Sequence, residues 1–233
     1  MLKNRSTRIF LTLFFVLIEL VLAICLQTVG GREADLCRYA VVVLACLFCL
    51  LFFEKTPSYF LTQLALICTV GADYFLVAAL ETKQLPAMLF FSVTQLAYFA
   101  RLYWEDRSRM RRTVHLIARV ALSVVALILT LAVLGEATDA VALVSVFYYA
   151  NLILNLIFAF LNFKAQYLMA VGFLLFLLCD TVIGFSFLEN YLALSPDSWV
   201  HSIFSVGFDL AWAFYAPSQV LLALSLLPKR LKK

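Results

Sequence analysis

Strongly apolar stretches follow one another along almost the whole chain, and they constrain the fold more than any other feature. Eight of them fall at about residues 9–27, 39–53, 59–80, 86–103, 116–134, 140–161, 166–187 and 199–227. A helix that spans a bilayer needs about 20 mostly apolar residues. Of the 233 residues, 65% are hydrophobic, against roughly 45–50% in soluble domains. The sequence therefore predicts an all-α, multi-pass membrane protein: an eight-helix bundle that forms a single transmembrane domain over residues 1–233.

Basic residues are distributed unevenly between the two sides of this predicted bundle. One side collects Lys3, Arg5, Arg8, Lys55, Arg101, Arg107, Arg109, Arg111, Arg112, Lys164, Lys229, Arg230, Lys232 and Lys233, and the other has only Arg32, Arg38 and Lys83. Because cytoplasmic loops are enriched in Lys and Arg, we expect both termini in the cytoplasm. The basic loop Arg101–Arg112 either contacts anionic lipid headgroups or only determines the orientation of the protein in the membrane. A charge spread in this way does not indicate a nucleic-acid partner.

One further cation, Arg119, falls inside an apolar stretch. It lies one helical turn from His115, near the predicted cytoplasmic end of the fifth helix. Long basic side chains near a helix end commonly extend to the membrane surface. We therefore expect Arg119 to reach the surface and not to pair with groups inside the bundle.

Two aspartates stand deep inside apolar stretches. The charges next to Asp180 in the sequence are Lys164 and Glu189, and Asp73 is placed in a similar way. A carboxylate at the centre of a bilayer costs about 2.5–3.5 kcal/mol on insertion scales, so such a residue indicates function. We expect the helices at 59–80 and 166–187 to lie side by side, with the two carboxyl groups in one enclosed chamber. Two carboxyl groups in one dry cavity cannot both ionise readily, which leaves one proton donor and one acceptor.

Other polar side chains within the apolar stretches are candidates for positioning water or a substrate headgroup. They are Glu19, Gln95, Asn151, Asn155, Asp209, Tyr215 and Gln219. Asp209 is expected as a third acid near mid-depth, on one helix face with Ser202 and Ser205. The asparagines form a polar stripe that either bonds neighbouring helices or lines a polar cavity.

Several kinds of chemistry lack their sequence signatures. The two histidines, His115 and His201, are expected near opposite ends of the membrane, and no HExxH, GxSxG or phosphate-binding glycine loop occurs. This pattern does not indicate a zinc or serine hydrolase. Acid–base work or ion handling by carboxyl groups remains, and neither needs a metal or an organic cofactor. The more apolar neighbours of Asp180 favour it as the proton donor.

Four short motifs occur in order along the chain. They are Lys55-Thr-Pro57, Val70-Gly-Ala-Asp73-Tyr-Phe-Leu76, the segment from Gly172 to Asp180, and Tyr215 with Gln219 four residues later. Together they resemble the signatures of the YhhN-like integral membrane proteins, the lysoplasmalogenases and their relatives. The second motif is similar to the GD-x-x-L signature of that family, with an alanine between the glycine and the aspartate. In the third, Cys179 stands where the family usually has serine.

The resemblance implies an activity and a substrate class. It implies hydrolysis of the vinyl ether bond of lysoplasmalogens, with Asp73 and Asp180 as the acid–base pair. The partner would be a lysophospholipid or another single-chain lipid taken from the surrounding membrane lipids. Two alternatives remain open. One is a proton-coupled transporter, favoured by a faint repeat of four plus four helices with an aspartate in the third helix of each half. The other is a non-catalytic, lipid-binding family member.

Overall fold

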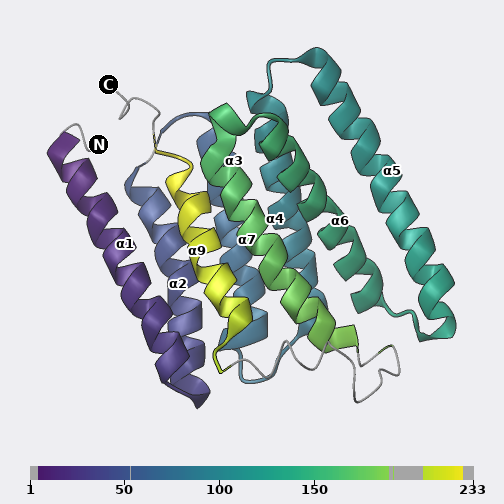
Figure 1. Cartoon of the computed structure of the whole chain (residues 1–233), viewed down its shortest axis with the longest axis horizontal. Helices are drawn as coiled ribbons and strands as arrows, with labels where there is room; N and C mark the ends of the chain where they lie inside the picture. Colours follow the sequence, from purple (N-terminus) through teal and green to yellow (C-terminus); the bar gives the residue numbers. More distant parts are fainter. Residues whose placement is uncertain (1–4, 53, 189–190, 192–206, 228–233) are drawn as a thin grey trace.

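The computed structural model describes residues 5–52, 54–188, 191 and 207–227. Seven helices in these residues are long and apolar enough to cross a membrane, and an eighth is shorter. They are α1 (Arg5–Thr28), α2 (Gly31–Leu51), α3 (Pro57–Asp73), α4 (Gln84–Glu105), α5 (Arg109–Leu134), α6 (Ala140–Leu161), α7 (Phe163–Leu188) and the shorter α9 (Leu210–Leu224). The prediction of an all-α, multi-pass membrane protein is confirmed (Figure 1). The first residues of the last predicted helix, 199–206, lie outside the described residues.

Local capping signals in the sequence set several helix boundaries. Thr56 precedes α3 and accepts a hydrogen bond from the backbone N–H of the third residue after it, at 3.3 Å, and Pro57 fills the first helical position. Asp139 caps α6 in the same way at 2.7 Å, and Asp209 caps α9 at 3.2 Å. Such side chains satisfy backbone N–H groups that the first turn leaves unpaired. Gly135, with φ of 54°, ends α5 in a conformation that favours glycine.

Six helices form a closed ring. In order round the ring, α2, α3, α4, α6, α7 and α9 each pack against the next, and α9 packs against α2. Helix α1 lies outside the ring against α2 and α9, and α5 lies outside against α6, so these two form opposite edges of the molecule in Figure 1. Helices α3 and α7 therefore face each other across the ring. The expectation that they lie side by side is wrong, because α9 and α2 on one side, and α4 and α6 on the other, separate them.

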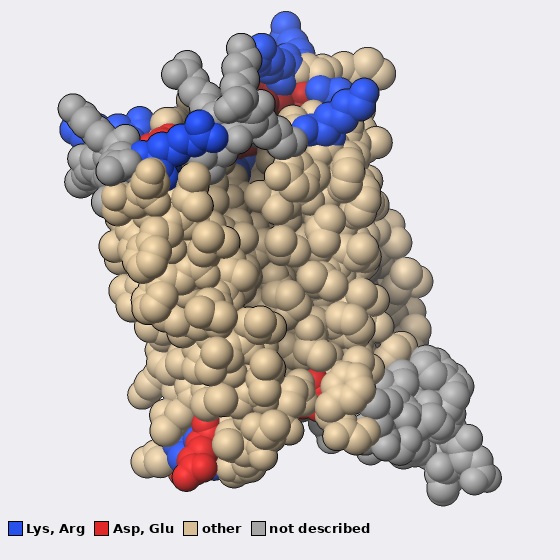
Figure 2. Space-filling view, turned by 60° about the vertical axis from the view of Figure 1, so that its left-hand side comes forward, with Lys and Arg blue, Asp and Glu red and all other residues tan. Residues whose placement is uncertain are grey.

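The two halves of the chain contribute the same pattern to this ring. Each half supplies one outer helix, α1 or α5, followed by three ring helices. Helices α3 and α7 occupy equivalent places and run in the same direction, from the end of the bundle where α1 and α5 also begin. Lysine and arginine side chains gather at that end (Figure 2), which we call the basic end. The arrangement agrees with the four-plus-four repeat expected from the sequence.

Aromatic side chains fill the interior of the ring. A single hydrophobic cluster includes the buried rings of Phe91, Tyr98, Tyr148, Phe173, Phe176 and Tyr215. Tyr98 packs edge-on against Phe173 at 5.2 Å between ring centroids. Rings in this geometry bury a large apolar area and attract one another. The ring interior is therefore a packed, low-dielectric environment, and any polar group in it must have a specific partner.

Candidate functional site

Asp73 is the last residue of α3 and its side chain points into the ring. The residue is 2% exposed, and its Oδ2 accepts a hydrogen bond from the hydroxyl of Tyr215 on α9 at 2.7 Å. Directly after Asp73 the helix widens into a π-helical turn over Tyr74–Ala78. Single π-helical turns inside α-helices are frequent at functional sites.

Asp180 holds the equivalent place on α7. Its Oδ2 accepts a hydrogen bond from the hydroxyl of Tyr148, which is buried on α6. Each aspartate is thus fixed by a tyrosine from another ring helix. Asp180 is only half-buried, whereas Asp73 is almost fully enclosed. The assignment of Asp180 as the proton donor, which rests on its more apolar sequence neighbours, stays a prediction.

The two carboxyl groups approach the same region of the ring from opposite sides. Between their tyrosine partners lies Phe176, whose ring centroid is 5.2 Å from that of Tyr215 and 6.5 Å from that of Tyr148. Each carboxyl group is thus bonded to a tyrosine that packs against Phe176. Both aspartates are thus bonded to tyrosines of one buried aromatic cluster, although their helices are not neighbours; that the two carboxyl groups share one chamber stays a prediction. Within the described part of the chain, no three His, Cys, Asp or Glu side chains form a cluster that could hold a metal ion.

Arg119 lies inside the bundle, and the expectation that it reaches the membrane surface is wrong. Its side chain is buried, and its guanidinium donates to the side-chain oxygens of Asn151 and, at 2.7 Å, Asn155 on α6. It also lies 4.1 Å from the ring centroid of Phe99 and 3.0 Å from His115. The asparagine stripe thus binds a neighbouring helix through a cation. Residues on α6 fix α5 to the ring in this way.

The same stripe continues into the ring through Gln95. The side-chain amide of Asn155 donates to the backbone oxygen and to Oε1 of Gln95, both at 2.9 Å. Three fully buried polar atoms on ring helices have no hydrogen-bond partner among the described residues: Gln95 Nε2, the Tyr98 hydroxyl and Gln219 Oε1. Buried polar groups in proteins are nearly always paired with protein or water. These atoms are therefore places where water or a polar substrate group would bind.

Two other predicted acids lie away from the aspartate pair. Asp209 caps α9 and forms an ion pair with Arg38 at 2.6 Å, at the end of the bundle opposite the basic end. It is not an acid at mid-depth, because the helix begins only after it; Ser202 and Ser205 lie outside the described residues. Glu19 is 3% exposed on α1, outside the ring, and neither of its carboxyl oxygens has a partner among the described residues.

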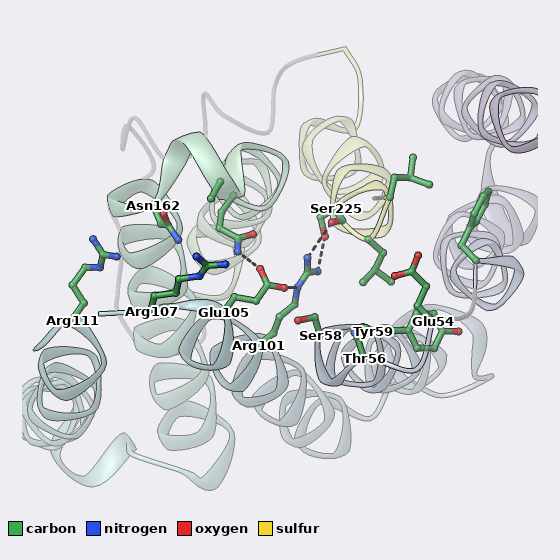
Figure 3. A pocket seen from close by; sticks show the side chains of 15 residues that line it. Glu54, Thr56, Ser58, Tyr59, Arg101, Glu105, Arg107, Arg111, Asn162 and Ser225 are labelled. Carbon is green, nitrogen blue, oxygen red and sulfur yellow. Dashed lines mark hydrogen bonds and ion pairs between the residues drawn. The ribbon is translucent and has the colours of Figure 1, made fainter. Parts of the chain in front are cut away.

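A cavity at the basic end is a second polar feature (Figure 3). Its volume is about 510 Å³, and its walls come from α3, α4, α7 and the residues after α9. Arg101, expected in a loop, lies in the last turns of α4 and is 3% exposed at the base of this cavity. Sequence analysis missed its role because its partners, Thr62 and Ser225, are 39 and 124 residues away.

These features define a class of protein: a multi-pass membrane protein whose ring of helices encloses two tyrosine-bonded aspartates. Residues 33–226 match the YhhN family, and the chain belongs to that family. The match covers nearly all of the six ring helices and includes Asp73, Asp180 and both tyrosine partners. The resemblance seen in the four motifs is thus confirmed. No curated protein and no solved structure matches the chain.

Proposed function

We propose that the protein hydrolyses the vinyl ether bond of lysoplasmalogens, with Asp73 and Asp180 as its acid–base pair. The products are a fatty aldehyde and a glycerophospho headgroup. The observation that carries the proposal is that two intramembrane carboxyl groups are each hydrogen-bonded to a tyrosine of one buried aromatic cluster. Membership of the YhhN family supports the substrate class. An intramembrane site suits a single-chain lipid, which can enter from the bilayer.

The proposed reaction uses one carboxyl group in each protonation state. The protonated carboxyl gives its proton to the β-carbon of the vinyl ether, which forms an oxocarbenium ion. The ionised carboxylate stabilises this cation and takes a proton from water as the water adds to the cationic carbon. As the hemiacetal breaks its bond to the glycerol oxygen, the second carboxyl group, now protonated, gives its proton to that oxygen. The first carboxyl group, now ionised, takes the proton of the hemiacetal hydroxyl, and the aldehyde leaves. One water is consumed, and both carboxyl groups return to their starting states, as in two-carboxylate glycosidases.

The surroundings of the pair support this chemistry. The hydroxyls of Tyr215 and Tyr148 each donate to one oxygen of a carboxyl group, which fixes its orientation. Phe176 supplies an apolar wall between them. A charge that develops in a low-dielectric interior interacts strongly with a fixed carboxylate. The unpaired polar atoms of Gln95 and Gln219 would hold the attacking water or the glycerol hydroxyl.

The test is an incubation of purified protein with a lysoplasmalogen and, separately, with an ester lysolipid. Free aldehyde and free fatty acid are measured by mass spectrometry. We expect aldehyde from the first substrate only. Asp73→Asn and Asp180→Asn should each lower turnover by at least about 100-fold, the range for loss of a general acid or base. Glu136→Gln removes an exposed carboxyl group far from the pair and should change nothing. Unchanged turnover in both aspartate variants would remove the pair from the mechanism.

A proton-coupled carrier is the second candidate, and the matching halves of the ring favour it. Many transporters consist of two repeats that place the binding site at their interface, near the middle of the membrane. Here α3 and α7 hold equivalent places with one aspartate each. A carrier predicts proton uptake into proteoliposomes that requires both aspartates and a co-transported solute. Aldehyde release without such uptake would exclude it.

A further inference from the structure

The cavity at the basic end has the size of a ligand site. Small-molecule sites commonly enclose about 300–1,000 Å³, and this cavity has a volume of about 510 Å³. Its lining is mostly polar or charged and includes Thr56, Ser58, Asn162 and Gln166. It opens at the end of the bundle where basic side chains gather. Its position and lining are thus those of a site at the membrane surface.

The base of the cavity is rigid because Arg101 ties three helices together. Its guanidinium donates to Thr62 Oγ1 at 2.7 Å on α3 and to Ser225 Oγ at 2.7 Å just after α9. It also pairs with Glu105 at 3.0 Å on its own helix. Glu105 in turn accepts a hydrogen bond from Gln166 on α7. The charge of Arg101 is therefore compensated, and this residue shapes the cavity without being free to bind a ligand.

Arg107, unlike Arg101, has a positive charge that no described carboxylate compensates. It lines the cavity, is exposed, and makes no ion pair or hydrogen bond through its side chain to any described residue. Arg111 uses Nε and Nη2 on Asp106, each at 2.8 Å, and its Nη1 has no such bond. Figure 3 shows both arginines on the same side of the cavity as Asn162, with Glu54 on the opposite side. One side of the cavity thus offers N–H donors and an uncompensated positive charge.

We propose that this cavity binds a phosphate ester, with Arg107 as the main ligand and Arg111 and Asn162 as further donors. A guanidinium matches the geometry of phosphate oxygens and forms charge-assisted hydrogen bonds to two of them. At this end of the bundle two sources supply such a group: the headgroup of a phospholipid and a free phosphate ester. Basic residues at a membrane surface also attract anionic headgroups.

The cavity is a site separate from the aspartate pair. Ser58 lines the cavity and precedes Asp73 by 15 residues of helix; Gln166 lines it and precedes Asp180 by 14. At 1.5 Å per residue the two sites are roughly 20 Å apart along the helices. In a lysoplasmalogen, only a glycerol backbone separates the phosphate from the vinyl ether. One substrate molecule cannot place its phosphate in the cavity and its vinyl ether at the aspartates, so the cavity takes a second molecule.

The test measures binding to the full-length protein in a neutral glycoside detergent, by native mass spectrometry. The probes are phosphatidylglycerol, a diacylglycerol with the same chains, and glycerol 3-phosphate. We expect phosphatidylglycerol to bind and diacylglycerol not to bind. Arg107→Gln should weaken binding by about tenfold, as expected for loss of a hydrogen bond between charged groups. The matched control is Arg109→Gln, which removes an exposed arginine that does not line the cavity and should leave binding within twofold.

Two further results complete the test. Glu54→Gln removes a negative charge from the cavity and should strengthen phosphate binding; weaker binding would overturn the proposal. Equal effects of Arg107→Gln and Arg109→Gln would overturn it as well, as would equal binding of diacylglycerol. If glycerol 3-phosphate displaces the lipid, a free phosphate ester is sufficient as the ligand. If it does not, the lipid headgroup is the ligand. Both of these results support a phosphate site.

Discussion

The packing of α7 against α9 makes Gly172→Ala the most informative single substitution. A Cβ atom at Gly172 would lie 3.0 Å from Cγ and 3.1 Å from Cδ2 of Leu222, and 3.4 Å from the backbone oxygen of Ser218. Leu222 and Ser218 are completely buried on α9. Because the neighbours of the added methyl are a buried side chain and a backbone oxygen, they must shift by a few tenths of an ångström to admit it.

The size of the effect follows from comparison with Gly184, on the same helix, where an added Cβ would meet nothing within 4 Å. Replacing glycine by alanine inside a helix gains roughly 0.5–1 kcal/mol from propensity at either position. Overpacking a filled core costs about 1–3 kcal/mol, and only Gly172→Ala incurs it. The propensity gain cancels in the difference. We therefore expect Gly172→Ala to be less stable than Gly184→Ala by about 1–3 kcal/mol.

The assay is thermal unfolding of both variants in detergent micelles, followed by tryptophan fluorescence. For a chain of this size, about 2–4 °C per kcal/mol gives a difference in Tm of roughly 2–12 °C. Gly71→Ala should fall between the two: its Cβ would meet the ring of Phe90 at 3.0 Å, but that ring is 37% exposed and can move. If Gly172→Ala and Gly184→Ala melt together, the helices are not in the close contact described.

Three further predictions concern other polar contacts. Tyr148→Phe removes the hydroxyl bonded to its aspartate; we expect lysoplasmalogen turnover to fall about tenfold with unchanged circular dichroism, and full turnover would contradict this. Asn155→Leu removes one of the two asparagine oxygens that accept from the buried guanidinium of Arg119 and should cost about 2 kcal/mol in thermal unfolding, more than Arg119→Met, which removes the charge itself; the reverse order would refute the contact. Hydrogen bonds and charge from Arg111 hold the pKa of Asp106 below its usual range. Carboxyl ¹³C NMR should therefore show this aspartate titrating below about 3.9, with Arg111→Gln raising the value. The stability from this contact should be present above the unfolded pKa and be lost as the pH falls through the folded one.

The spanning helices were predictable because hydrocarbon leaves the chain few choices. In lipid, a segment must satisfy its own backbone hydrogen bonds, so each long apolar stretch becomes a helix. The second helix begins earlier than its apolar stretch and takes in Arg32 and Arg38. The residue at which a helix begins is thus harder to predict from the sequence than the presence of the helix.

The start of the last described helix shows a limit of reading apolar stretches. Asp209 was placed inside a long helix because apolar residues surround it. It follows Gly207 and Phe208 and caps the helix that begins with Leu210. An aspartate just before an apolar run is a common helix start, and that signal was present in the sequence. Its pairing with Arg38 was not predictable, because 171 residues separate the two.

Partners across the ring could not be predicted from the sequence. Short connections place most consecutive helices side by side, but the sequence does not show which distant helices meet to close the ring. Arg119 was misplaced for this reason: its asparagine partners lie on another helix, 32 and 36 residues away. The two acids could be singled out from the sequence because a buried carboxyl group is costly wherever its helix lies. The free-energy cost of burying a carboxyl group singles out Asp73 and Asp180 in the sequence. Only the order of the helices in the ring shows which residues surround them.

The π-helical turn after Asp73 gives this helix a tolerance for changes in length. In a regular α-helix, one extra residue rotates everything beyond it by about 100°. A π-helical turn holds one residue more than an α-helical turn, and Tyr74–Ala78 forms such a turn. The extra alanine in the motif, Ala72, lies next to it. Because the helix ends at Ala78, a relative with a segment one residue shorter here would close the wide last turn and leave Asp73 in place.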